Sequence, residues 1–97
     1  MTPKTYEIVK TEGFNKDMTR LSAKVRRLDE FIKGVEEVLS RSPEKGKTTK
    51  NKYVLAFKMK QLPGNPKLTV YYLYTQTEVV FLFLRTDEDP QPPPMIL

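Results

Sequence analysis

The sequence predicts one α+β domain, in which a helical hairpin packs on one face of an antiparallel sheet and the element order is β-α-α-β-β-β. Two patterns predict this fold. Apolar side chains recur at spacings of three and four between residues 12 and 40, which is typical of amphipathic helices. After residue 52, three largely apolar segments follow one another with short turns between them, which is typical of an antiparallel meander. The chain of 97 residues has the length of one domain, and we assign residues 1–86 to it.

The first strand is expected at residues 5–10, where TYEIVK alternates apolar with polar side chains over most of its length. Thr11 suits the N-cap of a following helix, because its hydroxyl can accept a hydrogen bond from the first turn. Glu12 then stabilises that turn through its negative charge. A first helix is therefore predicted to begin at residue 12.

The apolar stripe that follows is long enough for one helix or for two. A single helix over residues 12–40 would measure about 43 Å, which exceeds the small sheet expected beside it. Ser22 is a suitable N-cap for a second helix, so we predict a hairpin of helices at about 12–21 and 23–40, with one long helix as the alternative. The stripe consists of Phe14, Met18, Leu21, Val25, Leu28, Phe31, Ile32, Val35, Val38 and Leu39.

The segment 41–52 is predicted to be a loop, because it contains proline and glycine and no apolar side chain. Strands are predicted at 53–62 and 67–75. Pro63 and Gly64 suit the centre of a type II turn between them, since proline fixes the first φ and glycine tolerates the positive second one.

The last strand is predicted at residues 78–85, after a short turn. It is apolar on both faces, as expected for a strand in the interior of a sheet. The remaining segment, 87–97, is acidic and then proline-rich. Because proline cannot join the interior of a sheet, we expect this segment to be a flexible tail.

Side chains two apart in a strand share a face. The more apolar sides of the later strands are expected to face the helices, and the aromatic residues expected in the core are Tyr53, Phe57, Phe81 and Phe83. The opposite face then carries Lys58, Lys60, Lys67, Thr69 and Tyr71.

The positive charge of the chain is concentrated in its middle. The net charge is +5. Residues 41–70 hold eight Lys or Arg and one acid, a net charge of +7, whereas residues 71–97 hold one Arg and four acids, a net charge of −3. A local positive field of this kind suits phosphate groups or an acidic protein partner. A solvated lysine-rich loop is the alternative.

The residue types that are missing exclude several kinds of chemistry. The chain has no cysteine and no histidine, which removes disulfides, thiolate metal sites and the commonest general base. Consecutive acids near the C-terminus make a poor metal site, so we expect no metal and no small-molecule cofactor. No apolar run approaches the ~20 residues that span a bilayer, and the N-terminus lacks the apolar core of a signal peptide. We therefore expect a cytoplasmic protein with no membrane contact.

The most informative stretch is FKMKQLPGNPKLTVYY, at residues 57–72. It places Lys58 and Lys60 two apart in one strand and Lys67 seven positions later, where the next strand begins. Together with the opening TYEIVKTEGFNKDMTRL and the finish VYYLYTQTEVVFLFL, it resembles the bacterial RelE/ParE toxin superfamily from about residue 6 to residue 85. The Lys-x-Lys pair and the later basic residue are similar to the messenger-cleaving branch, in which an arginine is usual at the position of Lys67.

The resemblance implies the toxin of a type II toxin–antitoxin system. It implies a ribosome-dependent endoribonuclease that cleaves mRNA and is neutralised by a cognate antitoxin. Toxins of this branch usually carry an arginine near the last strand, a role that Arg85 can fill, and a tyrosine or histidine close to the C-terminus. No tyrosine or histidine follows Arg85 here, so Tyr71 or Tyr72 is expected to substitute. The catalytic residues implied are Lys58, Lys60, Lys67, Tyr71 and Arg85.

RNA cleavage by 2′-hydroxyl attack needs a proton acceptor, positive charge beside the phosphorane and a proton for the leaving oxygen. Neighbouring ammonium groups lower one another's pKa, so one lysine of the cluster can be neutral beside two charged ones. Tyr71 can stack on an unpaired base, and Arg85 can hold phosphate through its planar fork. Non-specific RNA binding is expected from the lysines of the central loop, Lys45, Lys47, Lys50 and Lys52.

Two other interpretations of these lysines stay open. Exposed sheet faces carry lysines for solubility, and lysines at sheet edges deter aggregation. A non-catalytic binding protein of the same fold is the second alternative, either of the gyrase-inhibiting type or an inactive relative. The missing C-terminal tyrosine or histidine favours this second alternative.

Overall fold

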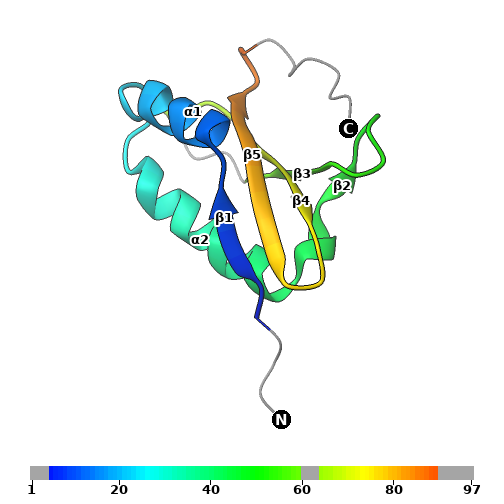
Figure 1. Ribbon diagram of the computed structural model, residues 1–97. Helices are drawn as coiled ribbons and strands as arrows, with labels where there is room; N and C mark the ends of the chain where they lie inside the picture. Colours follow the sequence, from blue (N-terminus) through cyan, green and yellow to red (C-terminus); the bar gives the residue numbers. More distant parts are fainter. Residues whose placement is uncertain (1–4, 60–63, 90–97) are drawn as a thin grey trace.

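The computed structural model describes residues 5–59 and 64–89 (Figure 1). These residues form an α+β fold with two helices and a five-stranded sheet. The elements in chain order are β1 (Glu7–Lys10), α1 (Glu12–Ser22), α2 (Leu28–Arg41), the 3-10 turn η1 (Pro43–Lys45), β2 (Lys47–Thr48), β3 (Leu55–Lys58), β4 (Leu68–Tyr74) and β5 (Glu78–Thr86).

The sheet has the strand order β1-β5-β4-β3-β2. The antiparallel meander predicted for the three long later strands is confirmed, because β4 pairs antiparallel with both β3 and β5. The prediction that the whole sheet is antiparallel is wrong, since β1 pairs in parallel with β5. Parallel pairing requires a long connection, and here most of the chain lies between the two strands. β5 is thereby an interior strand, as its apolar sequence predicts.

The short strand β2 corrects the prediction that residues 41–52 form only a loop. Lys47 lies opposite Ala56 and Thr48 opposite Leu55, which adds a two-residue edge strand to β3. Both residues of β2 are exposed. An exposed edge strand needs no apolar side chain, so hydrophobic patterning could not reveal it.

The helical hairpin is confirmed, and the alternative of one long helix is wrong. Thr11 caps α1 as predicted, with its hydroxyl accepting a hydrogen bond from the Phe14 amide at 3.2 Å. Ser22 does not cap the second helix: it is the last residue of α1, and α2 begins at Leu28 after Arg27, whose φ is 59°. Val25 is buried within the connection. The apolar stripe therefore continues through the break, and its periodicity could not locate the start of α2.

The core lies between the sheet and the helices. Leu55 and Phe57 of β3 lie opposite Tyr72 and Val70 of β4, and all four contact or belong to the core cluster. The other core residues include Phe14, Leu21, Val25, Leu28, Ile32, Val35, Leu39, Leu68, Val79, Phe81 and Leu84. The helical stripe is thus buried as predicted at most positions. Met18 and Phe31 are partly buried against the core, and Val38 is 36% exposed.

Tyr72 of β4 connects the segment after α2 to the sheet through hydrogen bonds of its hydroxyl. Its side chain is fully buried, and its hydroxyl donates to the Pro43 carbonyl and accepts from the Gly46 amide at 2.9 Å. A methyl group at Gly46 would collide with the hydroxyl and ring of Tyr72. Glycine is therefore required at position 46 by the close approach of this tyrosine.

Alanine at Gly46 should consequently lower the free energy of unfolding by about 1–3 kcal/mol, because the buried ring must shift to admit the methyl group. Gly34 of α2 is the control, since a methyl group there meets no atom within 4 Å. Gly34→Ala should stabilise the protein by about 0.5–1 kcal/mol through helix propensity. Urea unfolding of both variants measures the difference. Equal effects of the two substitutions would contradict the packing described for Tyr72.

Burial raises the pKa of Tyr72 to about 12 from its ordinary value of 10.0. A raised pKa means that the folded state favours the neutral phenol, so this stabilisation is complete below pH 10 and is lost as pH rises from 10 through about 12. The loss amounts to roughly 2–3 kcal/mol.

We expect Tyr72→Phe to be less stable than the parent at pH 8, because Pro43 and Gly46 lose a partner, yet to lose less stability between pH 10 and pH 12. Tyr53→Phe, which removes a hydroxyl from an exposed side chain, is the control for the loss of stability at pH 8 and should be as stable as the parent there. Urea unfolding across this pH range measures the effect. If the free energy of unfolding falls equally with pH in Tyr72→Phe and in the parent, the burial of the Tyr72 phenol does not cause the loss of stability above pH 10.

Candidate functional site

The sheet face opposite the core carries a row of polar side chains across three strands. Lys58 of β3 lies opposite Thr69 of β4, and Thr69 lies opposite Arg85 of β5. Directly opposed residues of antiparallel strands share a face and lie ~4.5–5.5 Å apart. Lys58 and Arg85 therefore flank Thr69 closely enough for both long side chains to reach one phosphate group.

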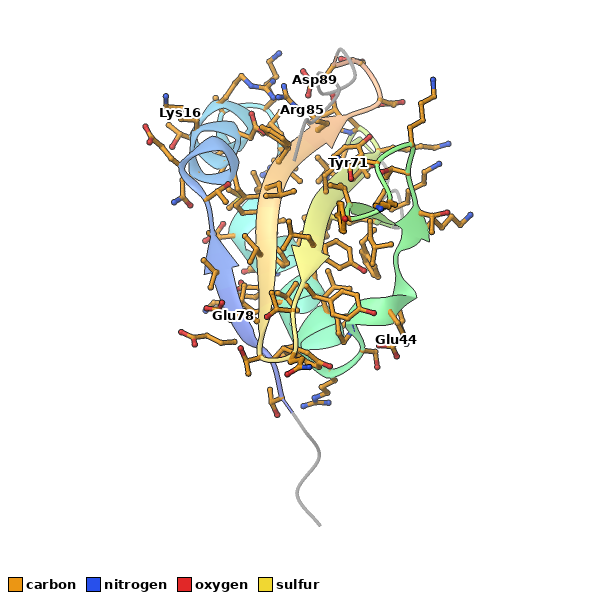
Figure 2. All side chains as sticks on the ribbon, turned by 45° about the vertical axis from the view of Figure 1, so that its right-hand side comes forward. Lys16, Glu44, Tyr71, Glu78, Arg85 and Asp89 are labelled. Carbon is orange, nitrogen blue, oxygen red and sulfur yellow. The ribbon has the colours of Figure 1, made fainter. Side chains whose placement is uncertain are left out.

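A second row lies beside the first and contains two aromatic side chains. Tyr71 of β4 lies opposite Ala56 on one side and Phe83 on the other, and Lys47 of β2 continues the row beyond Ala56. We call these two rows together the open face. Figure 2 is turned toward this face, and no helix of the described chain crosses in front of Tyr71 or Arg85.

Two of the aromatic residues expected in the core lie elsewhere. Phe83 is half-buried on the open face, because β5 bulges between Phe81 and Phe83 and the two rings point to opposite sides of the sheet. Tyr53 is 56% exposed, with the Lys52 ammonium 5.0 Å from its ring centre. Phe81 and Phe57 face the helices as predicted.

The guanidinium of Arg85 is held by its surroundings. Its Cζ atom lies 5.3 Å from the centre of the Phe83 ring, and its Nε atom lies 3.7 Å from Oδ2 of Asp17. The Asp17 carboxylate is itself fixed to β5, because Oδ2 accepts a hydrogen bond from the Leu84 amide at 2.9 Å. Arg85 is therefore presented to the open face in a restricted orientation.

Asp17 was missed by sequence reasoning although a signal was present. It lies three residues after Phe14 and four before Leu21, on the apolar side of α1, and it is only 7% exposed. A carboxylate in that position must have buried partners. β1 ends at Lys10, so the edge of β5 beyond it is covered by α1, and Asp17 satisfies the backbone there.

A second ion pair joins α1 to the turn after β5. Arg20 donates to both carboxylate oxygens of Asp89, at 3.0 and 3.2 Å, and Oδ2 of Asp89 also accepts from the amide and hydroxyl of Thr86. The pKa of Asp89 would be raised by burial, but these hydrogen bonds outweigh that effect and lower it. The pKa of Arg20 is raised, chiefly by its hydrogen bond to Asp89.

Residues 87–89 of the expected flexible tail thus form a defined turn, shown at the top of Figure 2 beside Arg85. The rest of that expected tail, 90–97, lies outside the described residues.

The predicted lysine cluster is described in part. Lys58 is on the open face, and Lys67 is exposed immediately before β4, where its carbonyl accepts from the Asp87 amide at 3.1 Å. Lys60 lies outside the described residues. The loop lysines are exposed on η1, on β2 and in the turn that leads to β3: Lys45, Lys47, Lys50 and Lys52.

The structure distinguishes the two tyrosines that were expected to substitute for the C-terminal one. Tyr72 faces the core with its hydroxyl engaged by Pro43 and Gly46. Tyr71 is half-buried on the open face, two residues along β4 from Thr69 and on the same side of the sheet. Only Tyr71 is therefore placed beside the row that contains Lys58 and Arg85.

Comparison with known proteins does not identify the chain: no protein-family model and no curated protein sequence matches it. Neither helix in the described part of the chain is long and apolar enough to cross a bilayer. Within residues 5–59 and 64–89, no three carboxylates gather closely enough to hold a metal ion.

Proposed function

We propose that the chain is the toxin of a type II toxin–antitoxin system, with a RelE-like fold, and that it cleaves mRNA on the ribosome. The observation that carries the proposal is the row Lys58–Thr69–Arg85, which lies beside Tyr71 on a sheet face that neither α1 nor α2 of the described residues covers. Two cations flank a neutral hydroxyl, and an aromatic ring lies next to them. This arrangement suits one RNA phosphate and its adjoining base.

The chemistry requires no group outside the protein and the RNA. The 2′-oxygen attacks the adjacent phosphorus, the bond from phosphorus to the 5′-oxygen breaks, and a 2′,3′-cyclic phosphate and a 5′-hydroxyl result. The 2′-hydroxyl proton passes to a basic side chain of the site, and an ammonium group donates a proton to the leaving 5′-oxygen. Arg85 stabilises the charge on the phosphorane, and Tyr71 stacks on the exposed base.

The partner implied by this role is a cognate antitoxin with an acidic segment. The row Val9–Val80–Leu73 crosses β1, β5 and β4 on the same side of the sheet as Tyr71, and its side chains are half-buried. An antitoxin segment with acidic and apolar residues would complement both this row and the cations beside it. Such binding would block access of RNA. Cleavage of mRNA on ribosomes would take place in the cytoplasm.

A non-catalytic binding protein of the same fold is the second candidate. The observation that favours it is the composition of residues 86–97, which include no tyrosine and no histidine. A protein of this kind would inhibit gyrase or bind a partner without cleaving RNA. It would use the open face as a binding surface only.

Induced expression in a bacterium tests these candidates. The wild-type chain is expected to stop growth and to fragment mRNA within ribosome-bound reading frames, whereas the triple alanine variant at Lys58, Lys60 and Lys67 should do neither. Growth arrest with DNA damage and intact mRNA would instead support the gyrase-inhibiting type. Normal growth with intact mRNA would support a binding protein without toxicity.

A further inference from the structure

Asp17 is the one buried acidic side chain among the residues that the structure describes. It belongs to α1, which contributes no residue to the open face. Its carboxylate nevertheless lies against Arg85. The α1 helix therefore contacts Arg85 of the proposed RNA site through the Asp17 carboxylate.

The contacts of Asp17 fix it relative to the strand that carries Arg85. Oδ2 accepts from the amide of Leu84, the residue immediately before Arg85, at 2.9 Å. Oδ1 lies 3.5 Å from Nη2 of Arg20, which supports the carboxylate from the opposite side. Asp17 cannot move far without breaking a backbone hydrogen bond of β5.

The Nε atom of Arg85 is buried and has no hydrogen-bond partner within the described chain, although Oδ2 of Asp17 lies 3.7 Å away. A buried donor without a partner requires an explanation. Hydrogen bonds of catalytic groups are often long in the unliganded state and shorten when substrate binds. A guanidinium directed at a carboxylate through Nε can offer its terminal nitrogens to a phosphate.

We propose that Asp17 is a positioning residue of the RNA site, which orients the Arg85 fork toward the scissile phosphate. The 3.7 Å contact shortens to a hydrogen bond when the phosphate binds. The ring of Phe83 holds the other side of the guanidinium in place. This inference rests on the proposed function as an RNA-cleaving enzyme.

Two roles of Asp17 predict different results for Asp17→Asn: a role of its negative charge alone, and a role in orienting Arg85. Removing a negative charge near the RNA site should tighten binding and leave turnover unchanged if charge alone matters. Positioning predicts that kcat for cleavage of ribosome-bound mRNA falls about 10–100-fold, because a misoriented cation stabilises the transition state poorly. The asparagine retains an oxygen that can accept from the Leu84 amide, which favours folding.

Glu88→Gln is the matched control. It removes one negative charge from an exposed acid in the turn after β5, and it leaves in place the Asp89–Arg20 pair that supports Asp17. Its kcat should stay within about twofold of the parent value. In the Arg85→Ala background, Asp17→Asn should cost less than about twofold, since it acts through Arg85.

Three outcomes are distinguishable. A wild-type protein that leaves mRNA intact overturns the proposed function and this inference with it. A wild-type protein that cleaves mRNA, with an unchanged kcat in Asp17→Asn or an equal loss in the Arg85→Ala background, overturns the inference alone. A loss of kcat that depends on Arg85 supports it.

A measurement on the wild-type protein can overturn the inference if Asp17→Asn does not fold. The Nε–H proton of Arg85 should exchange with water at least about tenfold more slowly than that of Arg41, an exposed arginine at the end of α2. Equal exchange rates would show that Arg85 is not held by Asp17.

Discussion

For the proposed mRNA cleavage on the ribosome, alanine at Lys58 should slow the reaction by about 10²–10³-fold, and alanine at Arg85 should have an effect of similar size. Each substitution removes one of the two cations that flank Thr69 in the row across β3, β4 and β5. The phosphorane that would form during cleavage carries more negative charge than the phosphodiester from which it forms. The cations therefore stabilise the transition state more than the bound RNA, and their removal should lower mainly kcat. Single-turnover cleavage on programmed ribosomes measures this effect.

Lys33→Ala is the matched control for this prediction. Lys33 is an exposed lysine of α2, and α2 packs on the other side of the sheet from the open face. Its replacement removes the same charge and should change the rate by less than about twofold. A similar small effect of Lys58→Ala and Lys33→Ala would show that the open face lysine serves solubility.

Alanine at Asp17 should lower the free energy of unfolding by about 3–5 kcal/mol, the largest stability effect that we expect from one substitution. It leaves the Leu84 amide without its acceptor and leaves Arg85 partly buried without a counterion. Domains of this size are stable by only about 5–15 kcal/mol. The variant should therefore unfold at much lower urea concentrations than the parent.

The control for Asp17→Ala is Asp29→Ala, in the first turn of α2. Asp29 is exposed, and its charge interacts with the helix N-terminus, so its loss should cost at most about 1 kcal/mol. If urea unfolding gives Asp17→Ala a cost as small as that of Asp29→Ala, then Asp17 does not hold α1 to β5 as described.

The helices and long strands were predictable because their apolar periodicity is strong. The break between α1 and α2 was misplaced, since Val25 extends the stripe through a segment that is not helical. The local sequence also could not predict strand β2, because this two-residue strand is defined only by its pairing with β3. Parallel pairing of β1 with β5 depends on the path of the whole chain and leaves no local pattern.

The site was predictable where the alternation of side chains along a strand decides which face of the sheet a residue lies on. Alternation placed Lys58, Thr69 and Tyr71 on the face opposite the core, in agreement with the structure. It could not place Phe83, because the bulge in β5 changes the phase of alternation. The register that sets Arg85 opposite Thr69 depends on that bulge and on turn lengths, so only the structure shows which cations share a row.

Photocrosslinking tests the central claim, that mRNA contacts the open face, most directly. A benzoylphenylalanine at position 69, in the centre of the row between Lys58 and Arg85, is predicted to crosslink to mRNA in the ribosomal complex. The same group at position 33 on α2 is predicted to give no mRNA crosslink. Crosslinks to mRNA from position 33 and none from position 69 would contradict the account.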